Sequence, residues 1–277
     1  MSQAYSQKVN IARDYYNSDD ADNFYAIIWG GEDIHIGLYE SLEDSIIEAS
    51  HHTVRHIADM LNLKPEFHVL DIGSGYCGAA RYLAKTFGCK VTALNLSEKE
   101  NLRARELNEA AGLSNLIQVI DGSFENIPTE HNTFDVVWSQ DAILHSGEKI
   151  KVMQEVTRVL KTNGQFIFTD PMQADDCPSG VLQPVLDRIH LDSLGSFAFY
   201  RNQAEKLGWQ ELSIENLTPQ LISHYTRVKQ ELTNRREELN GKVSDEYIDR
   251  MSQGLTHWID AGNHGYLSWG ILHFRKP

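Results

Sequence analysis

The spacing of apolar residues along the chain changes near residue 65. Before that point, residues 41–63 carry apolar side chains at the three- and four-residue intervals of an amphipathic helix. After Pro65, short apolar runs alternate with segments of helical period, separated by glycines and polar residues. Such alternation predicts a parallel sheet with helices on both faces. The apolar positions of the first segment are Leu42, Ile46, Ile47, Val54, Ile57, Ala58 and Leu61.

The middle of the chain shows this alternation most clearly. Ser97 and Glu100 have the spacing of a capping box, so we expect a helix to begin directly after Ser97. We expect strands within residues 68–72, 90–97, 116–122, 134–142 and 165–171, and helices within residues 79–87, 98–112 and 149–161.

The last third of the chain departs from the alternation. Residues 199–218 show one more helix and strand, residues 219–262 are largely helical and charged, and residues 266–276 form a closing strand. The stretch 219–262 is therefore predicted to be an insertion before the last strand, suited to covering a substrate, although a plain helical bundle fits the same pattern. We divide the chain into an N-terminal helical lid segment (1–64), a core (65–176) and a C-terminal part with the insertion (177–277).

Composition narrows the class of protein. With 41% apolar and 23% charged residues, the 277-residue chain can bury a large core. It has no apolar run of the ~18 residues that span a bilayer and no apolar core of a signal peptide near its start, so we expect a soluble, cytoplasmic protein. The net charge of −14 disfavours binding to phosphate backbones, and hence to nucleic acid. The oligomeric state is left open.

Cysteines and histidines give no sign of a metal site. The three cysteines, Cys77, Cys89 and Cys177, are odd in number and lack ligand spacing, so buried reduced thiols are expected. His51 and His52 are adjacent on a predicted helix, where neighbouring side chains point apart. We expect neither a disulfide framework nor a metal.

The turn after the first predicted strand carries the most informative motif. In VLDIGSGYCG, Gly73, Gly75 and Gly78 match G-x-G-x-x-G, in which missing side chains let a nucleotide-like ligand approach the backbone and a helix N-terminus. The same pattern binds nicotinamide dinucleotides, so a dehydrogenase or a non-catalytic nucleotide-binding protein is an alternative. Asp71 favours a cationic ligand, because a carboxylate is unfavourable beside a pyrophosphate.

Four stretches within residues 67–171 resemble the motifs of class I S-adenosylmethionine-dependent methyltransferases: DIGSGYCGAARYLA, DGSFENIP, FDVVWSQDAILH and RVLKTNGQFIFTDP. The resemblance implies their α/β Rossmann-like fold, with a mostly parallel seven-stranded sheet, and S-adenosylmethionine as cofactor with S-adenosylhomocysteine as its product. It also implies a cofactor site. Asp71, Gly73 and Gly75 would hold the methionine end, Asp121 the adenine amino group and Gln140 the sulfonium side, with further contacts from Leu96, Gly122, Ser123 and Phe124.

One position departs from this family pattern. The end of the second strand normally presents an acid to both ribose hydroxyls, whereas this chain has Asn95 there. An amide can donate to one hydroxyl and accept from the other, so we expect ribose binding to survive. The missing acid also weakens the dehydrogenase alternative, which requires one at the same place.

The flanks resemble a narrower family, the sarcosine/dimethylglycine N-methyltransferases. FYAIIWGGEDIHIGLYE, VLDRIHLDSLGS and HWIDAGNHGYLSWGILHFRK carry this resemblance, which extends over nearly the whole chain. It implies methylation of dimethylglycine, and possibly of sarcosine, to the osmolyte glycine betaine. Methyltransferases that act on other small amines, phenols or lipid-like rings share parts of the same pattern and remain an alternative.

Residues 24–40 are expected to close over the reacting molecules, because methyl transfer needs a water-free, aligned site that tolerates a cation. Tyr25 and Trp29 offer aromatic rings to the sulfonium and to the product ammonium, with packing of the N-terminal helices on the core as the alternative. Gly30, and with it Gly31 and Gly37, allows a tight backbone. His35 is placed to donate to a carboxylate. Glu32 and Asp33 are expected to be solvated.

The acceptor side of the site is predicted from positions after the fourth and fifth strands. His145 is a candidate base for the proton that sarcosine must lose, or else a structural histidine. Dimethylglycine gives a product with no N–H, so binding and positioning of its unprotonated amine would suffice. Pro171 and Met172 would form an apolar wall. His190 and Arg201, with Arg227 behind them, are candidates for the substrate carboxylate, and further aromatic candidates are Tyr200, Trp258, Tyr266 and Trp269.

Overall fold

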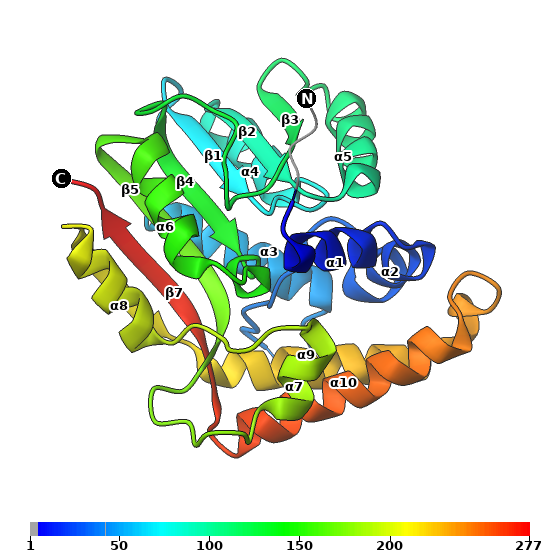
Figure 1. The fold of residues 1–277 in the computed structure, drawn as a ribbon. Helices are drawn as coiled ribbons and strands as arrows, with labels where there is room; N and C mark the ends of the chain where they lie inside the picture. The colour runs from blue at the N-terminus through cyan, green and yellow to red at the C-terminus, as the bar shows by residue number, and fades with distance from the viewer. Residues whose placement is uncertain (1–4, 42) are drawn as a thin grey trace.

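The computed structural model describes residues 5–41 and 43–277, and its centre is a single sheet (Figure 1). Residues 1–4 and Leu42, which belongs to the helix predicted in residues 41–63, lie outside the described residues. The seven strands are ordered β3-β2-β1-β4-β5-β7-β6, and β7 runs antiparallel to both of its neighbours. They are β1 (His68–Ile72), β2 (Lys90–Asn95), β3 (Ile117–Asp121), β4 (Phe134–Gln140), β5 (Leu160–Gln173), β6 (Gln210–Asn216) and β7 (Leu267–Arg275).

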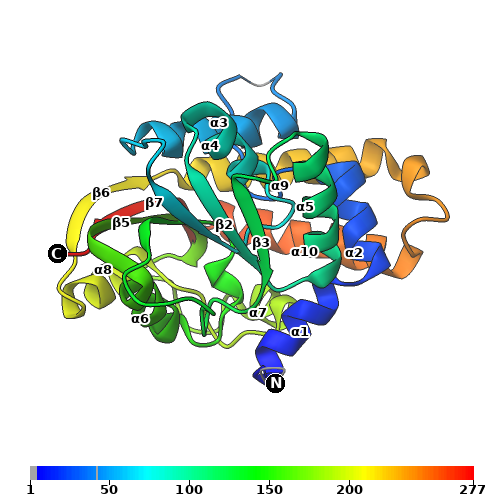
Figure 2. The ribbon, with the colours of Figure 1, turned by 90° about the horizontal axis from the view of Figure 1, so that it is seen from above.

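Helices cover both faces of this sheet, as Figure 2 shows from above. One face packs against α3 (Ile46–Asp59), α4 (Gly78–Phe87) and α5 (Glu98–Ala110), and the other against α6 (Lys149–Val159) and α8 (Phe197–Lys206). Adjacent strand residues point to opposite faces, so both cores draw on the same strands. The mostly parallel, doubly covered sheet confirms the predicted fold class.

The N-terminal helices and the insertion before β7 meet at the carboxyl ends of the parallel strands. Between β6 and β7, α9 (Thr218–Asn234) and α10 (Asp245–Asn263) pack along each other and form the predicted insertion, with α7 (Gln183–Ile189) against α10. From the other end come α1 (Gln7–Tyr16) and α2 (Asp19–Phe24), and Figure 1 shows them between the sheet and α10. Short helical turns occur at η1 (Tyr25–Trp29), η2 (Ile143–His145) and η3 (Arg236–Leu239).

The segment expected to close over the reacting molecules, residues 24–40, is partly helical. Residues 25–29 continue α2 as a π-helix, which ends at Gly30 with a φ of 116°. This wider turn is stabilised by packing, because Tyr25, Ile28 and Trp29 belong to a buried cluster with residues of α9 and α10. Residues 30–41 and 43–45 contain no regular element. We call residues 30–41 the strap.

Two local predictions need correction. The capping box at α5 forms only by half: Ser97 Oγ accepts from the Glu100 amide at 3.1 Å, but the Glu100 carboxylate is turned inward to Asn95. A complete box begins α3 instead, at Ser45 and Glu48. Of the cysteines, Cys77 and Cys89 are buried free thiols, whereas Cys177 is partly exposed.

Candidate functional site

The carboxyl ends of β1, β2, β3 and β4 bring together four polar side chains that are distant in sequence. Asp71 of β1 is in register with Trp138 of β4, and Gln140 follows two residues after Trp138 on the same strand. Asn95 of β2 is in register with Asp121 of β3. This edge is where ligands bind in open parallel sheets. The predicted cofactor residues therefore occupy one continuous line.

The glycine turn after β1 is tightly packed. Gly73 and Gly75 have φ values of 77° and 48°, which side chains rarely adopt. The amide of Gly73 donates to the Leu94 carbonyl at 2.8 Å, and a Cβ on Gly73 would lie 2.3 Å from that of Ala142. The turn therefore brings bare backbone to the start of α4.

Asp71 is a buried carboxylate that receives no hydrogen bond from any described residue. Its side chain is nearly inaccessible, and burial raises its pKa to about 7. A carboxylate in such a place is stabilised only by a counter-charge. Asp71 is thus suited to the ammonium or sulfonium of a cationic ligand.

The end of β2 contains an acid after all, supplied by the following helix. The buried Glu100 accepts from Asn95 Nδ2 at 2.8 Å through Oε2 alone, and burial raises its pKa to about 7. Together the amide and the carboxyl offer a donor and acceptors to a diol. Sequence reasoning missed Glu100 because its spacing from Ser97 had been assigned to the capping box.

The other two side chains of this line, those of Gln140 and Asp121, also suit a polar ligand. Gln140 Oε1 accepts from Trp138 Nε1 at 3.0 Å, which leaves Gln140 Nε2 buried and without a partner. Asp121 is exposed and accepts from Asn101 at 2.7 Å and Arg105 at 3.2 Å. Other predicted contacts, Leu96, Gly122, Ser123 and Phe124, follow β2 and β3 directly.

The strap lies over the glycine turn and is fixed by buried charges. Asp33 is 7% exposed, so the prediction that it is solvated is wrong. Burial would raise its pKa, but His35 and His51 outweigh this and hold the pKa below its usual range. His51 Nδ1 lies 2.9 Å from Asp33 Oδ2, and His35 Nε2 lies 3.8 Å from Oδ1. Glu32 pairs with Arg81 of α4 at 3.0 Å.

Asp141, which sequence reasoning did not single out, joins the strap to the sheet. It has a φ of 51° directly after β4. Its two oxygens accept from the Ile36 amide and from Trp269 Nε1, each at 2.7 Å. Trp269 is fully buried, so its role is to orient Asp141. The QDAILH stretch contained this residue, but only the fold shows its partners.

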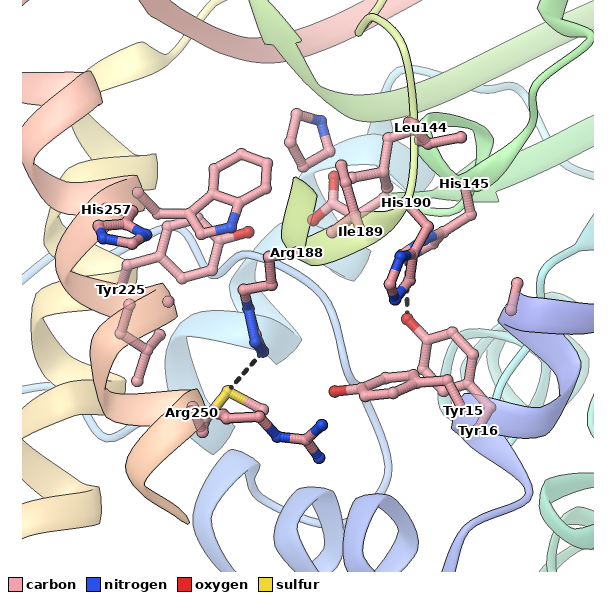
Figure 3. A pocket seen from close by; sticks show the side chains of 18 of the residues that line it. Tyr15, Tyr16, Leu144, His145, Arg188, Ile189, His190, Tyr225, Arg250 and His257 are labelled. Carbon is pink, nitrogen blue, oxygen red and sulfur yellow. Dashed lines mark hydrogen bonds between the residues drawn. The ribbon is translucent and has the colours of Figure 1, made fainter. Parts of the chain in front are cut away.

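A cavity of about 560 Å³ opens beside the strap (Figure 3). Its walls come from α1, the π-helix, the strap, η2, α7, α9 and α10. Of the predicted site residues, it is lined by Tyr25, Trp29, His35, His145, Pro171, His190 and Trp258. The residues that sequence reasoning missed include Tyr15, Tyr16, Asp141, Arg188, Tyr225, Tyr247 and Arg250.

His145 meets Tyr16 inside this cavity. Burial, then the charges of Lys149 and Arg188, lowers the pKa of His145 to about 4, so its imidazole is neutral at pH 7. With its proton on Nδ1, its Nε2 accepts from the Tyr16 hydroxyl at 2.9 Å. Burial raises the pKa of Tyr16, which keeps that hydroxyl protonated. The pair joins α1 to η2.

The turn that carries His145 is supported from behind. The Leu144 amide donates to Asp170 at 2.7 Å, and the Tyr200 hydroxyl donates to the same carboxylate at 2.6 Å. Lys149 Nζ donates to the carbonyls of Leu144 and Ser146 at 3.1 and 2.7 Å. Tyr200 therefore lies outside the cavity and positions the turn.

Several predicted substrate residues do not line the cavity. Met172 is fully buried in the core between the sheet and α6. Arg201 is exposed on α8 and pairs with Glu211 at 3.0 Å, on the far side of the sheet edge. Neither Arg227 nor Tyr266 is among the described lining residues. The fold thus removes Arg201 as a partner of a bound carboxylate, because its guanidinium is already paired elsewhere.

Known proteins were compared with the chain over its full length. The family model "Methyltransferase domain" matches residues 70–168. A sarcosine/dimethylglycine N-methyltransferase of Halorhodospira halochloris is 56% identical, covering 98% of this chain and 97% of its own. One of Aphanothece halophytica is 54% identical, with 96% of each chain covered. The chain belongs to the sarcosine/dimethylglycine N-methyltransferase family.

A solved structure agrees with this family assignment. A Galdieria sulphuraria protein, provisionally described as a sarcosine dimethylglycine methyltransferase, has a TM-score of 0.90 and 45% identity, with 95% of this chain and 98% of that chain covered. The dehydrogenase alternative is set aside, because the match to methyltransferases spans nearly the whole chain and not the glycine turn alone.

Membership of this family implies S-adenosylmethionine as cofactor, and the line of residues fits it. The uncompensated Asp71 suits its cationic methionine end, the Asn95–Glu100 pair suits a ribose diol, and the unpartnered Gln140 Nε2 is a free donor. Among the described residues, no group of three or more metal-binding side chains has a suitable arrangement. In the same part of the chain, no helix combines the length and apolar character needed to cross a bilayer.

Proposed function

We propose that the protein transfers methyl groups from S-adenosylmethionine to the nitrogen of sarcosine and dimethylglycine, forming glycine betaine. The observation that carries the proposal is the 54–56% identity, over at least 96% of each chain, to enzymes named for these two substrates. The cavity beside the cofactor line supports the proposal, because its aromatic lining suits methylated cations.

The cofactor, when bound, supplies an electrophilic methyl group on a positively charged sulfur. The nitrogen lone pair forms the new N–C bond while the C–S bond breaks and its electron pair stays on sulfur. The protein's task is to align the two molecules and exclude water. Tyr25 and Trp29 line the cavity, with ring centroids 5.3 Å apart. The ring centroids of Tyr25 and Tyr16 are 6.0 Å apart, so the aromatic wall extends to α1.

The tyrosines are held by one another as well as by packing. Tyr15 Oη lies 3.3 Å from Tyr25 Oη and 2.8 Å from Tyr247 Oη. These contacts connect α1, the π-helix and α10 around the cavity. Tyr25 and Trp29 also belong to a buried core cluster, so packing and substrate contact are roles of the same rings.

Each methylation must dispose of one proton. Both acceptors are zwitterions at neutral pH, so dimethylglycine too has to lose its ammonium proton before attack. The Tyr16 hydroxyl donates its own proton to His145 Nε2. Its oxygen can therefore accept a hydrogen bond from the ammonium of an acceptor bound in the cavity. Its pKa of about 4 makes His145 a weak base that holds the proton only transiently, so the Tyr16–His145 pair would relay the proton and not store it.

Turnover with defined acceptors tests the proposal. The purified protein is incubated with S-adenosylmethionine and glycine, sarcosine, dimethylglycine or a small phenol, and S-adenosylhomocysteine and methylated products are measured by mass spectrometry. We expect one product from dimethylglycine and two successive products from sarcosine. No turnover with any methylated glycine would refute the substrate assignment.

Sequential binding separates the fold from the acceptor. We expect S-adenosylhomocysteine to bind first in titration calorimetry, and dimethylglycine to bind the resulting complex. Cofactor binding with no response to dimethylglycine, together with turnover of another amine or a phenol, would keep the methyltransferase and replace its acceptor.

A further inference from the structure

The cavity contains positive charges that methyl transfer itself does not use. In a molecule with a net charge of −14, its lining carries the cationic Lys8, Arg188 and Arg250 against the carboxylates of Asp141 and Asp187. Lys8 pairs with Asp192 at the surface. Among the described residues, by contrast, neither Arg188 nor Arg250 forms an ion pair with a carboxylate.

The two carboxylates that line the cavity already accept other hydrogen bonds. Asp141 accepts from the Ile36 amide and the Trp269 indole, and Asp187 accepts from Gln183 Nε2 at 2.6 Å. An unpaired guanidinium inside a cavity is unfavourable unless an anion joins it. Because no ion pair engages either guanidinium among the described residues, both are available to a bound carboxylate.

Arg188 lies at the end of α7 and extends into the cavity. Figure 3 shows its side chain between Tyr225 on one side and Tyr15 and Tyr16 on the other. Within the part of the chain that the structure describes, its side chain makes one hydrogen bond, from Nη2 to the thioether of Met251 at 3.1 Å, a weak acceptor. Most of its five donors thus remain available to a ligand.

The chain makes space for this guanidinium on α10. A Cβ on Gly254 would lie 2.3 Å from Arg188 Nε, so a larger residue at that position would push the guanidinium aside. Beyond it, Arg250 is exposed at the edge of the cavity, with its guanidinium 5.9 Å from the Tyr247 ring. The charge of Arg188 also acts on His145, after burial and Lys149, which places it within electrostatic reach of the Tyr16–His145 pair.

We propose that Arg188, with Arg250 at the cavity edge, binds the carboxylate of the acceptor and thereby selects amino acids over neutral amines. The proposal rests on the function proposed above. In a methylated glycine a single carbon separates the carboxylate from the nitrogen, so a guanidinium that fixes the carboxylate also fixes the nucleophile. Planar, bidentate pairing of guanidinium with carboxylate provides this orientation.

Kinetics of Arg188→Met test the assignment, because methionine keeps an unbranched apolar stem and removes the charged guanidinium. We expect KM for dimethylglycine to rise about 30- to 100-fold, the loss of two charge-assisted hydrogen bonds, while kcat changes only a few-fold. For dimethylglycinamide, in which a neutral amide replaces the carboxylate, KM should change little between the wild type and Arg188→Met. The variant's preference for dimethylglycine over the amide should fall by the same factor, and Arg188→Lys should restore part of it.

Binding controls separate this role from others. Arg235→Met removes a surface guanidinium that pairs with Glu238 at 2.8 Å, and should leave every parameter unchanged. Affinity for S-adenosylhomocysteine should be the same in Arg188→Met and the wild type. An equal loss of cofactor affinity would overturn the proposal, because Arg188 would then serve the cofactor's own carboxylate.

A second variant guards against a folding defect. Gly254→Ala leaves Arg188 in place but displaces its guanidinium, so it too should raise KM for dimethylglycine while cofactor affinity stays unchanged. If the wild type turns over normally and both variants keep its preference for dimethylglycine over the amide, the Arg188 assignment alone is overturned. A wild type that neither methylates dimethylglycine nor binds glycine betaine in preference to choline overturns this assignment and the proposed function together.

Discussion

Asp71 and Glu100 make cofactor binding depend on pH. Burial raises the pKa of each to about 7, whereas a cationic ligand beside Asp71 requires the ionised form. Below pH 7, binding must therefore release a proton from each carboxyl that the ligand requires in its ionised form. For each such carboxyl, affinity falls by up to about tenfold per pH unit. We expect S-adenosylhomocysteine to bind more tightly as pH rises from 6 to 8. Calorimetry in buffers of different ionisation enthalpy would show the released protons.

Asp71→Asn provides the matched test of this linkage. It should weaken binding severely and remove the proton release that belongs to Asp71. Asp249→Asn, an exposed carboxylate of α10 beside Arg236, serves as the control and should behave as the wild type. Affinity that does not change between pH 6 and 8 would contradict the raised pKa of these carboxyls.

Tyr16 gives a second prediction at the residue scale. Tyr16→Phe removes the hydroxyl between the acceptor and His145, so kcat should fall by about two orders of magnitude, the usual contribution of a positioned acid–base group. The loss should shrink as pH rises, because solvent then supplies more unprotonated amine. Rates across pH 6–9 with sarcosine and dimethylglycine provide the measurement.

The control for this variant is Tyr82→Phe, which changes a partly buried tyrosine of α4 that packs on Phe87. Cofactor affinity should stay unchanged in both variants. A Tyr16→Phe enzyme with the wild-type rate and pH profile would assign Tyr16 to packing alone.

Sequence patterns located the residues whose neighbours are local and missed those whose partners are distant. Asp71 and Gly73 belong to one motif, so spacing was enough to find them. The role of Glu100 depended on a side chain that turns toward Asn95 instead of capping its helix. Arg188 depends on Gly254, far along the chain, and no periodicity connects the two.

Among the elements, the strap is the one most sensitive to small changes. Gly37 packs directly on α3, where an added Cβ would lie 2.8–2.9 Å from backbone atoms of Ala49 and Ser50. Its amide also donates to His224 Nδ1 at 3.1 Å. Gly37→Ala should therefore lift the strap, lowering the free energy of unfolding by about 1 to 3 kcal/mol and weakening cofactor and acceptor binding.

Thermal unfolding and binding of S-adenosylhomocysteine measure the two effects separately. Gly112→Ala is the control: its Cβ would meet nothing within 4 Å, and its φ of 69° confines the cost to local backbone strain. That variant should lose stability without losing affinity. Equal affinity in Gly37→Ala would mean that the strap does not shape the binding site.

The regular elements followed from periodicity because each buries one face against the sheet. The strap has no such period. Its conformation is set by contacts with four other parts of the chain, such as those of Asp33 with His51 and of Ile36 with Asp141. Its aromatic and glycine content indicated a covering role, but not that Asp33 would be a buried anion.

At the scale of the whole molecule, the cavity is enclosed by the N-terminal helices and by the insertion before β7. α2 and the start of α10 are joined by Asp20, which accepts from the Ser244 amide at 2.8 Å and from its hydroxyl at 2.5 Å. Asn23 donates to the Lys242 carbonyl at 3.0 Å, and Tyr15 meets Tyr247 at 2.8 Å. The sheet holds the cofactor line, and this joined cap holds the acceptor.

A cap joined in this way should respond to ligands as one unit. We expect residues 5–24 and 240–255 to gain protection from hydrogen exchange together when S-adenosylhomocysteine and dimethylglycine bind, while the central strands, already protected, change little. Asp20→Ala should speed exchange in both segments and raise KM for dimethylglycine, with cofactor affinity within about twofold of wild type, because the cofactor line does not depend on this contact. Asp245→Ala, which removes an exposed carboxylate beside Arg236 on the same helix, should alter neither segment beyond its own first turn. Protection confined to one of the two segments would show that the N-terminal helices and the insertion close over the acceptor independently.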